Sequence, residues 1–138
     1  MKVLFDTCII VDYLLDRKDF ANEAEKVIIP VIEKMFYGYI TVKSLMDTHY
    51  IIKKYLHNEE KTREIINILL ESFILVDSTK KDTINALTSS IKDFEDALMV
   101  ESAKSIKIDY IVSRNVKDFK NSSIPTITSK QLLSIISS

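Results

Sequence analysis

The sequence predicts an α/β fold in which a mostly parallel sheet of about five strands carries helices on both faces. Short apolar and β-branched runs alternate along the chain with longer stretches that have the helical period. One glycine and two prolines in 138 residues favour many helices joined by tight connections. This length fits one domain, so we expect residues 1–138 to fold as a single unit.

The predicted strands are short segments rich in valine, isoleucine, leucine, phenylalanine and tyrosine. Strands that alternate with helices are joined by crossover connections and therefore lie parallel, so that their carboxyl ends share one edge of the sheet. Functional sites of such sheets form at that edge. The predicted strands are 2–6, 39–42, 73–76, 109–112 and 126–127.

The predicted helices have apolar residues spaced three or four apart. Pro30 is expected to kink or end the second helix, because proline removes a backbone donor. Gly38 is expected to end that same helix, just before the strand at 39–42. The predicted helices are 8–15, 20–36, 44–56, 59–71, 80–90, 93–106 and 129–136.

The composition excludes several classes of protein. The single cysteine, Cys8, excludes an internal disulfide and a cysteine-based zinc site. No apolar run approaches the roughly 20 residues of a membrane span, and the first residues do not resemble a signal peptide. We therefore expect a cytoplasmic protein. With 19 basic and 20 acidic residues there is no overall basic field to attract nucleic acid, although an acidic metal site would leave basic residues free elsewhere.

Three aspartates, far apart in the sequence, stand where the fold can gather them. Asp6 ends the first predicted strand, Asp47 lies within helix 44–56, and Asp96 lies in the first turn of helix 93–106. Carboxylates brought together repel one another, so such a cluster is costly unless it binds a cation. The pattern therefore predicts a divalent-metal enzyme.

Each candidate also has a structural interpretation. Asp6 or Thr7 can simply cap the helix that follows, although the Thr7 hydroxyl can also orient the Asp6 carboxylate. Asp47 can be a solvated helix residue. Asp93 is placed to cap its helix and favours the positive end of the helix dipole, so we assign capping mainly to Asp93 and chemistry mainly to Asp96.

Polar residues also follow the fourth predicted strand. Ser113 and Asn115 offer short side chains that could bind a metal-bound water or a phosphate. Asp118 can support the same site or cap a helical turn. Arg114 and Lys43 are candidates for RNA backbone contacts, although a solvated surface position is the usual role of a lysine.

Four segments together resemble the PIN domain, the ribonuclease fold of VapC-type toxins in bacterial and archaeal toxin–antitoxin pairs. The resemblance spans essentially the whole chain and implies a PIN-like three-layer sandwich. The segments are Leu4-Phe5-Asp6-Thr7, Ile40-Thr41-Val42 leading to Asp47, Asp93-Phe94-Glu95-Asp96-Ala97-Leu98, and the run from Asp109-Tyr110-Ile111-Val112 through Ser113-Arg114-Asn115 to Val116-Lys117-Asp118-Phe119.

The resemblance implies a metal-dependent endoribonuclease that uses Mg²⁺ or Mn²⁺. Asp6 and Asp96 match the first and third acids of the family. Asp47 stands where the family usually has glutamate, and Asn115 where many members carry a fourth aspartate. Asp118, three residues on, can compensate for the missing charge. Asp6, Asp47, Asp96 and Asn115 are thus the predicted catalytic residues, the three aspartates being the predicted metal ligands.

The implied substrate is single-stranded or structured RNA, and the implied partners are a small antitoxin and a second copy of the chain. An alternative is a degenerate PIN domain that binds RNA or a protein without cleavage. Asp47 and Asn115 support that alternative. Cys8 stands where the family usually has asparagine, which removes a polar group that would support the site. A phosphoacceptor receiver domain does not fit, because it needs adjacent acids where Phe5 and Thr7 flank Asp6.

Overall fold

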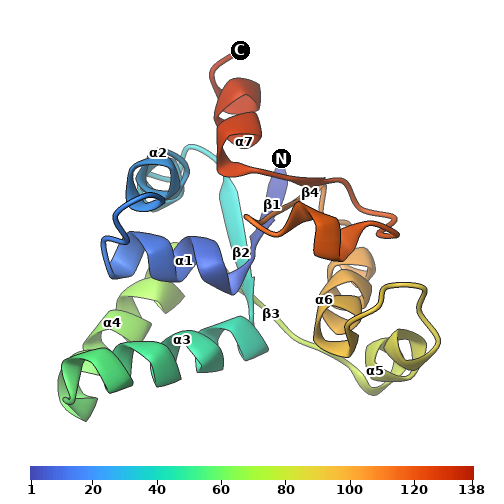
Figure 1. Cartoon of the computed structure of the whole chain (residues 1–138), viewed down its shortest axis with the longest axis horizontal. Coiled ribbons are helices and arrows are strands. Elements are labelled where there is room, and N and C mark those ends of the chain that lie inside the picture. The colour runs from blue at the N-terminus through green and yellow to red at the C-terminus, as the bar shows by residue number, and fades with distance from the viewer.

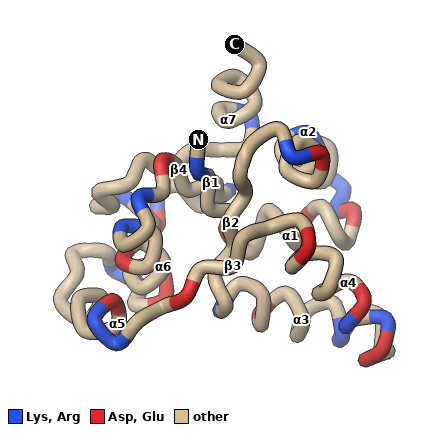
Figure 2. Tube along the Cα trace, turned by 180° about the vertical axis from the view of Figure 1, so that it is seen from behind, with Lys and Arg blue, Asp and Glu red and all other residues tan.

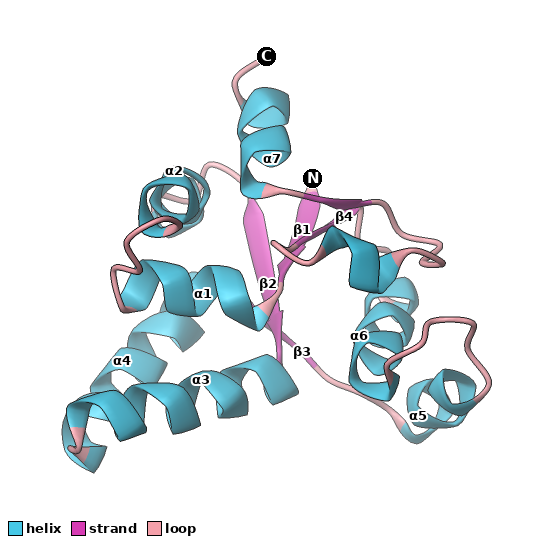
Figure 3. Ribbon diagram, in the orientation of Figure 1, coloured by secondary structure: helices cyan, strands magenta, loops and turns pink.

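The computed structural model, which describes residues 1–138, has one five-stranded sheet in the order β3-β2-β1-β4-β5 (Figures 1 and 3). Every neighbouring pair is parallel, which confirms the predicted α/β class. The strand nearest the N-terminus, β1, lies at the centre. The strands are β1 (Lys2–Phe5), β2 (Tyr37–Thr41), β3 (Ile74–Val76), β4 (Tyr110–Val112) and β5 (Thr126–Ile127).

Seven α-helices and one short 3₁₀ helix connect and flank these strands. None of the helices has the length and apolar character that crossing a membrane requires. The helices are α1 (Thr7–Leu14), α2 (Ala21–Ile32), α3 (Val42–Leu56), α4 (Glu59–Ser72), α5 (Lys80–Leu87), α6 (Phe94–Ser105), the 3₁₀ helix η1 (Val116–Phe119) and α7 (Ser129–Ile136).

The central strand builds a separate hydrophobic core on each face of the sheet. Val3 and Phe5 pack into a core shared with α1 to α4 and α7, whereas Leu4 packs on the other side against α5 and α6. This alternation follows from the two-residue period of a strand. The result is three layers, with the two helical layers on opposite sides of the sheet (Figure 1).

Two sequence predictions about the segment between α2 and β2 were wrong. The predicted helix 20–36 ends at Ile32, and Lys34 then adopts a left-handed backbone with φ of 60°. Pro30 is accommodated inside the last turn of the helix. Gly38 does not end the helix but lies within β2, where the backbone passes close to neighbouring side chains.

Gly38→Ala should lower the free energy of unfolding by about 1–3 kcal/mol, because it overpacks a filled core. A Cβ atom at this position would lie 2.6 Å from Cγ1 of Val31 and 3.0 Å from Cδ1 of Phe73. Urea unfolding measures the loss. Val31→Ala is the companion change, because it removes the side chain that the new Cβ would meet. If the clash is the cause, Val31→Ala should lower the free energy of unfolding less in the Gly38→Ala background than in wild type. Equal costs would contradict that account.

Candidate active site

The carboxyl ends of β1 and β4 bring Asp6 and Ser113 together. The two strands are parallel neighbours with Phe5 opposite Val112, so the next residue of each strand reaches the same edge of the sheet. The backbone N–H of Asp6 continues the pairing by donating to the carbonyl of Val112 at 2.9 Å. The hydroxyl of Ser113 then donates to Oδ2 of Asp6 at 2.7 Å.

The Asp6 carboxylate is held by three groups. Besides Ser113, the backbone N–H of Thr7 donates to Oδ1 at 2.8 Å, and the Cys8 thiol lies 3.7 Å from Oδ2. Burial, followed by the charge of Asp6, raises the pKa of the Cys8 thiol, so it remains a neutral donor. The side chain of Asp6 therefore caps α1 and stays fixed at the sheet edge.

The predicted bond from the Thr7 hydroxyl to Asp6 is not formed. That hydroxyl donates instead to Oγ of the buried Ser44, at the start of α3, at 3.0 Å. Ser44 is held in turn by Thr41, whose Oγ1 accepts from the Ser44 backbone N–H. This chain of hydroxyl groups joins α1 to α3. Serine and threonine are common near the start of any helix, so the sequence gave no signal of the contact.

Asp93 and Asp96 lie at the start of α6. Asp93 is the N-cap, and its Oδ2 accepts from the backbone N–H of Asp96 at 3.0 Å, which confirms the predicted cap. Burial raises the pKa of Asp96 to about 6, helped by the charges of Asp93, Asp6 and Asp118. The charge of Asp6 thus acts on Asp96, although the two residues are far apart in the sequence.

Asp47 is bound to a lysine in the structure. Its carboxylate accepts a hydrogen bond from Lys43, one helical turn earlier on α3. Lys43 also reaches Glu95 of α6 at 3.3 Å. Burial alone would lower the pKa of Lys43, but its bonds to Asp47 and Glu95 outweigh that effect and raise it. An ammonium group thus bridges two carboxylates between α3 and α6.

The remaining predicted residues lie beyond β4. The backbone N–H of Asn115 donates to Oγ of Ser113 at 2.9 Å, while the Asn115 side chain is exposed and forms no hydrogen bond. Asp118 lies inside η1 rather than at its cap, and Phe119 packs into the core. No three Asp, Glu, His or Cys side chains are grouped closely enough to hold a metal ion together.

Arg114 has a structural partner that the sequence did not reveal. Its Nε donates to Oδ2 of Asp12 at 2.6 Å and its Nη2 to Oδ1 at 3.2 Å. Asp12 is fully buried on α1 and also pairs with Arg17 at 3.4 Å. The guanidinium lies 3.9 Å from the ring centre of Phe20. The one signal in the sequence was an aspartate inside the apolar run of residues 9–15.

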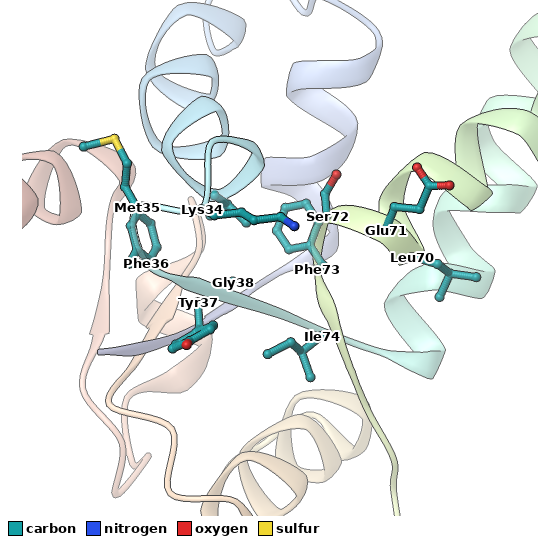
Figure 4. A pocket seen from close by; sticks show the side chains of 11 residues that line it. Lys34, Met35, Phe36, Tyr37, Gly38, Leu70, Glu71, Ser72, Phe73 and Ile74 are labelled. Carbon is teal, nitrogen blue, oxygen red and sulfur yellow. The ribbon is translucent and has the colours of Figure 1, made fainter.

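A hollow lies at the amino-terminal edge of the sheet, beside the starts of β2 and β3. It has a volume of about 540 Å³ and is lined mostly by apolar side chains where β2 and β3 begin, among them Tyr37 and Ile74 (Figure 4). Asp6 follows the opposite, carboxyl end of β1. Asp6 and this largely apolar hollow are thus at opposite edges of the sheet.

Comparison with known proteins identifies the fold family. Residues 2–117 match the family model described as the PIN domain. The chain belongs to the PIN domain family. Within this PIN domain, the matched region contains every predicted site residue except Asp118.

Solved structures of similar fold include several toxin–antitoxin proteins. A toxin–antitoxin complex from Klebsiella pneumoniae is 23% identical with a TM-score of 0.68, over 92% of this chain and 97% of that chain. VapBC2 from Rickettsia felis, bound to a promoter DNA fragment, is 17% identical with a TM-score of 0.69, over 93% and 98%. VapC20 from Mycobacterium tuberculosis, a sarcin-ricin loop cleaving toxin, is 9% identical with a TM-score of 0.62, over 79% and 86%.

These likenesses show that the PIN domain described here has the fold of VapC-type proteins. The search of curated proteins found no match.

Proposed function

We propose that this PIN domain is a divalent-metal-dependent endoribonuclease and the toxin of a toxin–antitoxin pair. The supporting observation is the position of Asp96: burial raises its pKa to about 6, and the charge of Asp6, from a separate element, is among those that add to the shift. Family membership and the similarity of fold to a toxin described as cleaving the sarcin-ricin loop add support.

The side chains at this edge fit Mg²⁺ or Mn²⁺ in their chemistry. The donors are carboxylate oxygens, which suit these hard cations. Mg²⁺ is commonly held by one or two carboxylates together with water and substrate phosphates, so a closed cage of three acids is not needed. Asp6 and Asp96 would hold the ion, and Asp47 would join them after release from Lys43.

The protein's own residues have separate roles in this mechanism. Ser113 and the backbone of Thr7 fix the orientation of Asp6, and Asp93 fixes the first turn of α6. The buried Ser113 hydroxyl donates to Asp6 and accepts from the Asn115 backbone, so the exposed Asn115 amide is the group proposed to orient water or phosphate. A bound divalent ion would acidify a water and offset charge on the leaving oxygen.

Lys43 and Arg114 remain predicted RNA contacts. Arg114 already holds Asp12, and Lys43 already holds Asp47 and Glu95. Each would have to bind a phosphate while keeping or exchanging those partners, and both side chains keep part of their surface in solvent.

The proposal includes a small antitoxin as partner, a homodimer and a cytoplasmic location, where RNA is available. Several solved neighbours are toxin–antitoxin complexes, some of them bound to DNA. Exposed apolar side chains on α3, such as Met46, Tyr50 and Tyr55, offer surface for a protein partner.

A second candidate is a PIN domain that binds RNA or protein without cutting. Two observations favour it: Asn115 is neutral where many relatives carry an acid, and Asp47 is bound to Lys43. Calorimetry with Mn²⁺ separates the two functions, since absence of binding would favour the non-cleaving protein.

Asp6→Asn should reduce Mg²⁺-dependent cleavage of RNA by at least about 100-fold, because it removes a proposed metal ligand. Loss of a residue that only orients a ligand typically costs about 10- to 100-fold. The assay compares product formation from one folded RNA with Mg²⁺ and with EDTA. Asp19→Asn is the matched control, since it makes the same charge change at an exposed position with no side-chain hydrogen bond or ion pair. Equal activity of wild type and Asp6→Asn would remove the assignment.

A further inference from the structure

A polar pocket adjoins the acidic site on the side of α6. It has a volume of about 660 Å³ and lies between the segment that joins α5 to α6 and the turn that follows β4. Asp93 and Asp96 line one side, and Asp118 of η1 lines another. At the rim, the side-chain amide of Asn121 donates to the carbonyl of Ser90 at 3.2 Å, which ties the two segments together.

Three lysines line this pocket: Lys92, Lys117 and Lys120. None of them forms an ion pair or a side-chain hydrogen bond within the protein, in contrast to Lys43 and Arg114. Basic and acidic positions are mixed around α5 and α6, so the molecule has no broad basic face there (Figure 2). Other lysines also lack an ion pair, but these three are distinguished by lining one pocket together with Asp96.

The lining of the pocket indicates the kind of ligand. Only Ile91 of its nine lining residues is apolar, and no aromatic side chain is present on which a base could stack. The volume lies within the range of small-ligand sites, at about 300–1,000 Å³. A chain of phosphate and ribose, which is anionic and polar, fits this lining better than a base does.

We propose that Lys92, Lys117 and Lys120 form a subsite for the RNA backbone, holding a phosphate next to the one that is cut. The inference rests on the proposed ribonuclease function and names where its substrate lies. The contacts are to phosphate and so position the strand without reading its sequence. The strand would then run from the acidic edge of the sheet across the start of α6.

The test measures how tightly the protein binds a short labelled single-stranded RNA. Binding is measured by fluorescence anisotropy, in EDTA so that no strand is cut. The variant Lys92→Gln/Lys117→Gln/Lys120→Gln should bind at least about tenfold more weakly than wild type at low salt. Its plot of log affinity against log salt should be shallower by about 0.7, the value for one phosphate contact with a single strand. Lys92→Arg/Lys117→Arg/Lys120→Arg, which keeps the charges, should bind as wild type does.

The matched control is Lys26→Gln/Lys61→Gln/Lys130→Gln, which removes the same charge from exposed lysines of α2, α4 and α7 that form no ion pair. It should keep wild-type affinity. Equal loss in both triple variants, or no binding by wild type, would overturn the subsite. A DNA strand of the same sequence carries the same phosphates and should lose affinity to the same extent in the lysine variant, whereas a loss confined to RNA would overturn contacts to phosphate alone.

Cleavage is measured separately, which distinguishes the two proposals. A wild-type protein that cuts RNA, with a lysine variant that still binds as tightly, would overturn the subsite alone. Binding that depends on the lysines, without any cleavage in Mg²⁺, would overturn the nuclease and leave the subsite in place.

Discussion

Asp96→Asn is expected to make the protein more stable at neutral pH and to slow RNA cleavage by at least about 100-fold. Burial and the charges of Asp93, Asp6 and Asp118 raise the pKa of Asp96 to about 6. At pH 7.5 the folded protein therefore carries a carboxylate that its surroundings disfavour. Asparagine keeps the size of the side chain and removes the charge.

The pH dependence has a definite sign. A folded pKa of about 6, against an ordinary value of 3.8, means that the folded protein binds the proton more tightly than the unfolded chain does. The resulting stabilisation is complete below pH 3.8 and is lost as the pH rises to about 6. The full shift corresponds to about 3 kcal/mol, which solvent screening of this half-buried group reduces to about 1 kcal/mol.

Thermal unfolding of wild type and of Asp96→Asn is measured at pH 7.5 and at lower pH down to 3.8. Asp96→Asn should be the more stable protein at pH 7.5, and the difference in stability should disappear near pH 3.8. A difference that does not change with pH would contradict the electrostatic explanation. In addition, Mn²⁺ should raise the melting temperature of wild type at pH 7.5 and less so below pH 6, where the proton competes for Asp96. Asp19→Asn should respond to Mn²⁺ as wild type does.

Asp12→Ala should lower the free energy of unfolding by about 3 kcal/mol, because it leaves the Arg114 guanidinium without its buried partner. Arg114 follows Ser113 directly, and Ser113 orients Asp6. Loosening the Asp12 pair should therefore also reduce cleavage, by about 10-fold. Urea unfolding and the RNA cleavage assay measure the two effects.

A double-mutant cycle with Arg114→Ala isolates the pair. Removing both side chains should cost less than the sum of the single changes, because neither charge is then left without its partner. Additive costs would show that Asp12 acts through Arg17 or through packing. Asp19→Ala, at an exposed position nearby, should change stability by less than about 0.5 kcal/mol.

Much of the fold could be predicted because its signals are local. The alternation of apolar runs and helical periods predicted the five strands and the seven α-helices, with the second helix drawn too long, and a parallel sheet placed Asp6 and Ser113 at one edge. The Asp93 cap was predictable for the same reason, since the residues involved are three apart. Gly38 was misinterpreted because its role depends on Phe73, which approaches it only after folding.

The site was predictable only in part. Lys43 and Asp47 are one helical turn apart, but the bridge from Lys43 to Glu95 depends on how α3 and α6 are arranged. Asp12 and Arg114 are 102 residues apart, and nothing in either neighbourhood indicates the other. The same holds for the pocket that Lys92 shares with Lys117 and Lys120.

The chain's own pattern was enough to establish the α/β architecture and the edge of the sheet where Asp6 follows β1 and polar residues follow β4, because hydrophobic period and capping act over a few residues. Packing between distant segments decided which acids interact, which are bound to a lysine or arginine, and which lysines are left unpaired. Charge interactions depend on separation in space and on burial, and neither quantity is contained in the order of the residues.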